Sequence, residues 1–175
     1  VTIVGNSPNG SNINDGVGSE CPQSLAAVFE LGAFDMGFAF DGDGDRMIAF
    51  DESGSKLSGE ATLGLLAIRA KAQGALKGDV LVTTAQSNLG LDAALGKVGI
   101  SVRRVDIGDK FVSRLMISDG FSLGGEESGH VVVGDFSMTG DGLFSALKVA
   151  QTVVESEQSL GELASFYQAY PQQTR

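Results

Sequence analysis

The segment "FAFDGDGDRMIAF" (residues 38–50) holds three aspartates that alternate with glycines, Asp41, Asp43 and Asp45. Carboxylates this close repel one another unless a cation lies among them. Carboxylate oxygens are hard ligands that suit Mg²⁺ or Ca²⁺, and the glycines allow sharp turns, so the side chains can converge. Arg46 follows directly and adds a bidentate donor for a phosphate. The pattern favours a metal-assisted site for phosphoryl transfer.

Three other interpretations of this loop stay open. The first is a solvated acidic turn. The second is an EF-hand calcium loop, because Asp41, Asp43 and Asp45 fit its first, third and fifth positions. However, Arg46 stands at the sixth position, where that loop needs Gly, and the flanks read as strands where it needs helices. The third is a phosphatase with an Asp-x-Asp nucleophile at a strand end, which normally carries Thr or Val where Asp45 stands.

A second motif, "LGGEESGHVVV", packs Glu126, Glu127, Ser128 and His130 between two apolar runs. His130 is the only histidine in the chain. A carboxylate, a hydroxyl and an imidazole in this spacing suit the recognition of vicinal sugar hydroxyls and a proton shuttle. The alternative is an acidic hairpin with a structural histidine.

Two weaker features lie elsewhere in the sequence. Lys110 in "VDIGDKF" follows a glycine-containing loop before a helix, so it is a candidate phosphate or hydroxyl contact. An exposed lysine at a helix start explains it equally well. Thr139 and Asp141 in "MTGDGLF" are ordinary N-terminal helix chemistry, and we assign them no catalytic role.

Composition restricts the class of protein. The 175 residues suffice for one domain or one and a piece, and 42% are apolar, so a packed core is expected. A net charge of −10 argues against binding to nucleic acid or to an anionic membrane. No apolar run approaches the roughly 18–20 residues that span a bilayer. The single cysteine, Cys21, forms no internal disulfide, so a cytoplasmic location is expected.

Strands and helices alternate in the predicted secondary structure. Strands are expected at residues 1–4, 34–40, 46–51, 79–85 and 100–106, and within 121–135 on both sides of a loop. Helices are expected at residues 22–32, 59–73, 88–99, 110–120, 140–156 and 160–170. Ser58 is the predicted N-cap of the second helix, and Ser159 with Glu162 forms a capping box for the last. The alternation from residue 58 onward predicts an α/β fold with a largely parallel, helix-covered sheet.

"DGDGDR" followed later by "GGEESGH" resembles the α-D-phosphohexomutase superfamily, in which the first is the metal loop and the second the sugar-recognition loop. The early segment "GNSPNGSNINDGVGSECP" resembles the "PDG-x-NIN-x-x-x-GS" pattern of its bacterial phosphoglucosamine mutase branch. Cys21 and Glu127 depart from that branch, which usually has His at the first position and Gln, Asn or Met at the second.

The resemblance implies a cofactor and roles for individual residues. Mg²⁺ would be held by the three loop aspartates and a phosphoserine. Arg46 would help to bind the phosphate of that phosphoserine. Glu126 and Ser128 would bind sugar hydroxyls, and His130 would lie near the reacting oxygens. Lys110 is the further candidate contact to the substrate.

The resemblance also implies a reaction and a domain organisation. Phosphate would move between the 6- and 1-positions of glucosamine through a bisphosphate intermediate. The serine loop "T-[AG]-S-H-N-P" does not occur, so the chain is expected to be inactive alone. The implied fold is a three-layer α/β/α mixed sheet flanked by helices. Residues 1–55 would end domain 2, residues 56–168 would form domain 3, and residues 169–175 would lead to a missing C-terminal domain.

Expected partners are a phosphosugar substrate and the other domains of a longer parent chain, with no nucleic acid and no membrane. A phosphomannomutase or phosphoglucomutase is the alternative within the superfamily. A non-catalytic module that binds a metal or a sugar phosphate is the alternative of another class.

Overall fold

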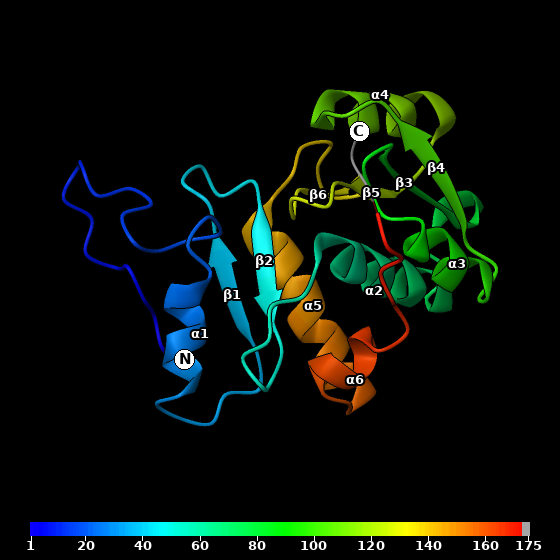
Figure 1. Cartoon of the computed structure of the whole chain (residues 1–175). Coiled ribbons are helices and arrows are strands. Elements are labelled where there is room, and N and C mark those ends of the chain that lie inside the picture. The colour runs from blue at the N-terminus through cyan, green and yellow to red at the C-terminus, as the bar shows by residue number, and fades with distance from the viewer. Residues whose placement is uncertain (173–175) are drawn as a thin grey trace.

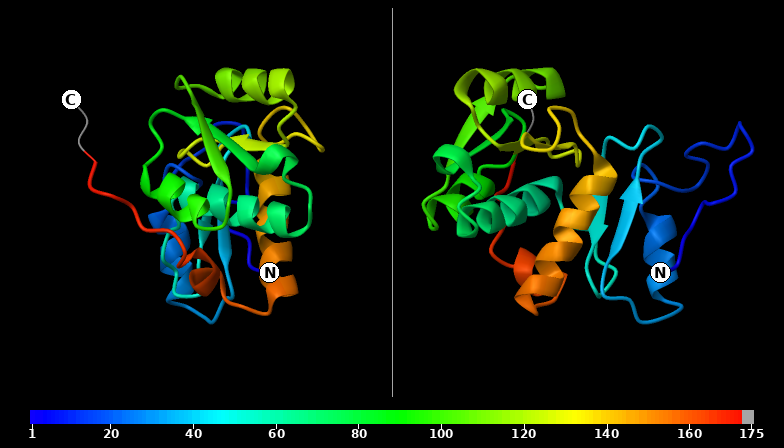
Figure 2. Two further views of the ribbon diagram at one scale, coloured as in Figure 1. Left: turned by 90° about the vertical axis from the view of Figure 1, so that its right-hand side faces the viewer. Right: turned by 180° about the vertical axis from the view of Figure 1, so that it is seen from behind.

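The computed structural model describes residues 1–172 and contains two sheets with a long helix, α5 (Gly142–Ser156), between them (Figure 1). The smaller sheet is an antiparallel pair, β1 (Gly37–Phe40) and β2 (Met47–Phe50). On one face of this pair, Ala39, Ile48 and Phe50 pack against α1 (Gln23–Phe29). The other face packs against α5, which the views from the side and from behind also show (Figure 2).

The larger sheet has four strands in the order β4-β3-β5-β6, at Ser101–Val105, Val80–Thr84, Leu123–Gly125 and Val131–Val133. Strand β3 runs parallel to both β4 and β5, whereas β6 runs antiparallel to β5. All residues of β3 are buried, including Thr83 and Thr84, as is typical of a central strand covered on both faces.

Helices cover both faces of this sheet. The remaining ones are α2 (Gly59–Ala72), α3 (Gly90–Gly96), α4 (Asp109–Asp119), α6 (Leu160–Ala164) and a short 3₁₀ turn, Lys77–Asp79. Because side chains alternate along a strand, Val80 and Val82 point toward α4, whereas Leu81 joins the core shared with α2, α3 and α5. The predicted three-layer α/β/α fold with a mixed sheet is therefore confirmed. No helix within residues 1–172 is long and apolar enough to cross a membrane.

Side-chain caps start the helices where the sequence predicts them. Ser58 Oγ accepts a hydrogen bond from Ala61 N at 3.1 Å and caps α2. Ser159 and Glu162 form the predicted capping box of α6. These contacts satisfy amide groups that have no partner inside the helix.

Expectations about secondary structure were wrong near both ends of the chain. Residues 1–4 form no strand, although their sequence is typical of one. No described strand lies beside them, and a strand without a neighbour leaves its backbone groups unpaired. The last helix ends at Ala164 and does not continue to residue 170. The short turn at Lys77–Asp79 was not predicted. Of the proposed linker at residues 169–175, residues 173–175 lie outside the described part of the chain.

Candidate functional site

The aspartate loop joins the end of β1 to the start of β2. Phe40 and Met47 are the last paired residues of the hairpin, so the pairing stops where the loop begins. Gly44 takes a positive φ of 75°, which lets the loop turn back on itself. Asp41, Asp43 and Asp45 each offer a carboxylate oxygen, and these oxygens lie within 4.8 Å of one another. The loop therefore brings the three carboxylates together, as a cation site requires.

Arg46 is the positive charge closest to these carboxylates in the structure. Its Nε donates to Asp41 Oδ2 at 2.7 Å, and its backbone N donates to Asp41 Oδ1 at 3.1 Å. Its Nη1 also bonds to Glu20 Oε1 at 3.1 Å. Both oxygens of the buried Asp41 are thus occupied, whereas the carboxylate of Asp43 is exposed.

The carboxyls of Asp41 and Asp45 differ in pKa. Burial raises the pKa of Asp41, but the hydrogen bond from the backbone of Arg46, the neighbouring Asp45 and the Arg46 side chain together outweigh burial, so the pKa lies below its ordinary value. Burial together with the neighbouring Asp41 raises the pKa of Asp45. The negative charge of Asp41 makes the ionisation of the Asp45 carboxyl harder. A cation held between the two carboxylates would favour that ionisation.

The Glu-Glu-Ser-Gly-His loop turns between β5 and β6. Glu126 N donates to His130 O at 2.9 Å, and Gly129 N donates to Glu126 O at 3.1 Å, with φ of 93° at Gly129. Glu126 Oε1 accepts from Gly108 N at 3.1 Å, and burial raises the pKa of this carboxyl. Ser128 is exposed at the tip of the loop.

The two loops meet although they lie far apart in the sequence. Arg46 and His130 form an antiparallel β-bridge, and Met47 N donates to Gly129 O at 3.1 Å. His130 Nδ1 lies 3.1 Å from Asp45 Oδ2. The imidazole is buried, and among residues 1–172 its Nε2 has no hydrogen-bond partner. The structure therefore places His130 beside the aspartate cluster.

Lys110 is the predicted site residue that lies outside both loops. It lies exposed in the first turn of α4, and its Nζ is 4.9 Å from the ring centroid of Phe111. Its connection to the site is indirect, because Gly108, in the loop before this helix, is the residue that donates to Glu126.

Sequence reasoning missed three residues that shape this site. Gly142 N donates to Gly44 O at 2.8 Å, which fixes the aspartate loop to the start of α5. A methyl group at Gly140 would collide with the His130 ring. The repeated glycines of "TGDG" are the sequence feature that could have indicated both of these close backbone contacts. No sequence signal indicates that Glu20 pairs with Arg46.

Asp141 behaves as the sequence predicts. Its Oδ1 accepts from Phe144 N at 2.8 Å and caps α5, between the two glycines that contact the site.

Comparison with known proteins adds a family model and similar sequences. The model of the phosphoglucomutase/phosphomannomutase family, alpha/beta/alpha domain III, matches residues 58–170. Phosphoglucosamine mutase of Magnetococcus marinus is 45% identical over 172 residues, which is 98% of this chain and 36% of that protein. The protein of the same name from Bacillus subtilis is also 45% identical, over 98% of this chain and 38% of its own length. The chain thus spans less than two fifths of these relatives.

Solved structures share the fold at low sequence identity. A phosphoglucomutase/phosphomannomutase family protein from Burkholderia thailandensis superposes with a TM-score of 0.78 at 24% identity, covering 87% of this chain and 33% of that chain. Aspergillus fumigatus N-acetylphosphoglucosamine mutase, solved in complex with GlcNAc-6P and magnesium, gives a TM-score of 0.70 at 19% identity, covering 93% and 42%.

Proposed function

Because the chain belongs to the phosphoglucomutase/phosphomannomutase family, we propose that it is part of a phosphosugar mutase that interconverts glucosamine 6-phosphate and glucosamine 1-phosphate. The proposed route uses a phosphoserine on the parent chain and a bisphosphate intermediate. The proposed organisation places residues 1–55 in domain 2 and residues 56–168 in domain 3. The choice of glucosamine rests on the two 45%-identical relatives named phosphoglucosamine mutase.

One observation carries the proposal: the bridge between Arg46 and His130, which joins the two loops. A mutase must hold the transferred phosphate and the sugar ring in one place. An acidic loop with an arginine suits the phosphate end, and a loop with carboxylates and a hydroxyl suits the sugar. Their direct contact supports one continuous site rather than two separate ones.

The aspartate loop fits Mg²⁺ by the chemistry of its donors. Asp41, Asp43 and Asp45 present converging hard oxygen ligands, and one oxygen of Asp45, Oδ1, is buried without a hydrogen-bond partner among the described residues. When bound there, Mg²⁺ would neutralise charge on the phosphoryl oxygens.

The chain's own residues would supply binding and proton transfer. Arg46 would share its guanidinium between Asp41 and the phosphate of the phosphoserine, because its planar fork binds two oxygens at once. Glu126 would accept hydrogen bonds from the sugar hydroxyls, and Ser128 would donate a hydrogen bond to them. His130, whose Nδ1 lies 3.1 Å from Asp45 Oδ2, would lie near the reacting oxygens and relay a proton. Lys110 would contact the substrate from the edge of the site.

The test of function compares this chain with its full-length parent. In an assay that converts the product glucosamine 1-phosphate further, we expect turnover by the parent and none by this chain, which lacks the serine loop. Turnover by the 175-residue chain would show that the serine loop is not required. Absence of turnover by the parent on any hexose phosphate would favour the non-catalytic binding module.

The test of the metal site compares Asp43→Asn with Asp35→Asn in this chain. Both remove one exposed carboxylate beside β1, but only Asp43 is a proposed ligand. By calorimetry we expect weak Mg²⁺ binding, weakened about tenfold further by Asp43→Asn and unchanged by Asp35→Asn. Sub-micromolar Mg²⁺ affinity would contradict the need for a fourth ligand from the parent. Tight Ca²⁺ binding would revive the calcium-loop interpretation, although strands flank the loop on both sides.

The alternative substrates are mannose and glucose phosphates, because the matching family model covers mutases named for both. Steady-state kinetics of the parent on the three hexose 6-phosphates would separate them. We expect kcat/KM to be highest for the glucosamine compound.

A further inference from the structure

A cavity separate from the candidate site opens between α2, α5 and the β5–β6 pair. In the view from behind, α2 and α5 meet at a steep angle, and the two strands lie above their meeting point (Figure 2). The cavity has a volume of about 340 Å³, within the range of roughly 300–1,000 Å³ that small-molecule sites occupy. None of the eight predicted site residues lines it.

Part of the lining of this cavity is apolar. Leu66, Leu123 and Val133 contribute to the lining, together with Ala70 on α2. Phe144 forms an aromatic wall, and its ring stacks on Phe136, with the two centroids 3.8 Å apart and the planes 3° from parallel. A flat apolar group could lie against such a wall in the same orientation.

The lining also carries one cation without a direct ion pair among the described residues, and the nearest link to a carboxylate runs through Gln151 to Glu155. Arg69 pairs with Glu155, and Asp135 pairs with Lys77. Lys148 forms no ion pair with any residue from 1 to 172. Its Nζ lies 3.3 Å from Gln151 Oε1 and 5.5 Å from the ring centroid of Phe144. An ammonium that no carboxylate contacts directly, beside an apolar cavity, is complementary to an anion.

We propose that this cavity binds a small amphipathic monoanion, with a flat apolar body against Phe144 and its negative group at Lys148. The apolar lining and the aromatic wall account for the body, and the unpaired ammonium accounts for the charge. This site is independent of the proposed mutase reaction, because it shares no lining residue with the candidate site.

The test uses two fluorescent probes that differ in one charged group. One is 1-anilinonaphthalene-8-sulfonate, and the other is the neutral N-phenyl-1-naphthylamine. We expect saturable one-site binding of the sulfonate to the folded chain, about tenfold tighter than binding of the neutral probe, because only the sulfonate forms a charge-assisted bond. Amide chemical shifts should change at Leu66, Ala70 and Val133.

Substitutions distinguish the contribution of the Lys148 charge to binding from that of the cavity. Lys148→Gln should weaken sulfonate binding about tenfold and leave the neutral probe unchanged. Ala70→Leu, which fills the cavity, should weaken both probes. Lys97→Gln, an exposed lysine beyond α3 with the same change of charge, should affect neither. If Ala70→Leu fails to fold by circular dichroism, Ala75→Leu replaces it in the same lining.

Three results would overturn the proposal. The first is sulfonate binding that Lys148→Gln leaves unchanged. The second is binding that survives when the cavity is filled, which would place the probe elsewhere. The third is a concentration-dependent dimer in sedimentation that perturbs the same amides without any probe, which would show that a second copy of the chain covers the cavity.

Discussion

Asp41 and Arg46 depend on each other for their charge states. The Asp41 side chain is only 1% exposed, and a buried carboxylate is costly unless a cation and hydrogen bonds satisfy it. Arg46 supplies both, through its side chain and its backbone N. The arginine that the sequence suggests for phosphate binding is therefore already needed to hold the loop together.

Replacing Arg46 should destabilise the chain more than an exposed arginine does. We expect Arg46→Ala to lower the free energy of unfolding by about 3 kcal/mol, because Asp41 stays buried without its partner. Arg46→Lys should recover part of this loss, since an ammonium restores charge but not the planar fork. Urea unfolding measures both.

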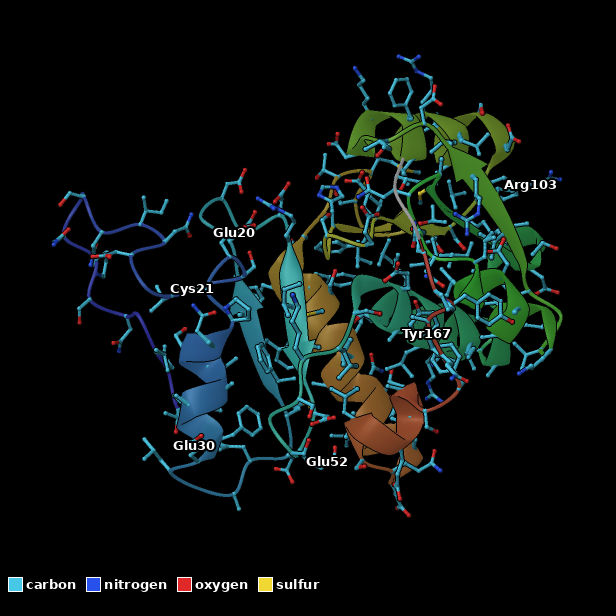
Figure 3. All side chains as sticks on the ribbon, in the orientation of Figure 1. Glu20, Cys21, Glu30, Glu52, Arg103 and Tyr167 are labelled. Carbon is cyan, nitrogen blue, oxygen red and sulfur yellow. The ribbon has the colours of Figure 1, made fainter. Side chains whose placement is uncertain are left out.

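Arg103→Ala is the matched control, because Arg103 points away from β4 into solvent (Figure 3). Its effect should stay within about 0.5 kcal/mol. Equal effects of Arg46→Ala and Arg103→Ala would show that Arg46 does not stabilise the buried carboxylate.

At the scale of elements, both ends of the β1–β2 hairpin are attached to the rest of the chain. At the aspartate end, Met47 bonds to Gly129 and Gly44 bonds to Gly142. At the opposite end, Glu52 accepts from Ser159 Oγ at 2.6 Å and from Gly161 N at 3.0 Å, at the start of α6. The second attachment places a negative charge at a helix N-terminus, where it is favourable.

The attachment through Glu52 predicts a pH-dependent contribution to stability. Its hydrogen bond from Ser159 and that from Gly161 N lower the pKa of Glu52 below the ordinary 4.5. A lowered folded pKa means that the stabilisation is complete above the unfolded pKa and disappears as pH falls through the folded value. Glu52→Gln should therefore cost about 0.5–1 kcal/mol near pH 7, after screening by solvent, and almost nothing well below pH 4.

Thermal unfolding at several pH values measures this difference. Glu30→Gln is the control, because Glu30 is an exposed carboxylate beyond α1 (Figure 3). A cost of Glu52→Gln that stays constant with pH would show that charge plays no part in the attachment.

Contact between α2 and the Glu-Glu-Ser-Gly-His loop depends on a glycine. A methyl group at Gly59 would collide with the backbone carbonyl of Glu127. We expect Gly59→Ala to destabilise the chain by about 1–3 kcal/mol, because backbone cannot move aside cheaply. A methyl group at Gly96 in α3 would meet nothing within 4 Å. We therefore expect Gly96→Ala to raise the free energy of unfolding, by about 0.5–1 kcal/mol.

Denaturant unfolding of the two alanine variants checks the prediction directly. Amide shifts of the loop should move in Gly59→Ala and stay in place in Gly96→Ala. Destabilisation of similar size in both would attribute the effect to the loss of glycine itself rather than to the contact with Glu127.

At the scale of the whole molecule, one hydrophobic core extends from the hairpin to the larger sheet. Met47 of β2, Leu81 of β3 and Val149 of α5 belong to the same buried cluster. Because α5 packs on both sheets, the two should unfold together rather than as separate units.

Val149→Ala tests this cooperativity, because Val149 is fully buried between the sheets. We expect a loss of about 2 kcal/mol. In native-state hydrogen exchange, the amides of Met47 and Leu81 should lose protection by equal amounts. Loss of protection at Met47 alone would show that the hairpin opens independently of the larger sheet.

The sequence alone determined the structural features that depend only on residues close together in the chain. Glycines between aspartates make the acidic loop, Ser58 and Ser159 start their helices, and the alternation of strands and helices from residue 58 onward gives the α/β class. These features follow from local backbone conformation and from hydrogen bonds within one turn of helix, so they can be predicted without knowing the fold. The residues proposed for the site were found in the same way, by side-chain type and spacing.

Only the tertiary structure decided which segments meet. The contact between Asp45 and His130 joins residues 85 positions apart, and the Arg46–Glu20 pair has no sequence signal. The predicted strand at residues 1–4 did not form, since apolar β-branched residues still need a neighbouring strand to pair their backbone groups. The cavity beside Lys148 likewise exists only because α2 and α5 cross under the β5–β6 pair. Contacts of this kind depend on how distant elements pack, and no local pattern in the sequence encodes them.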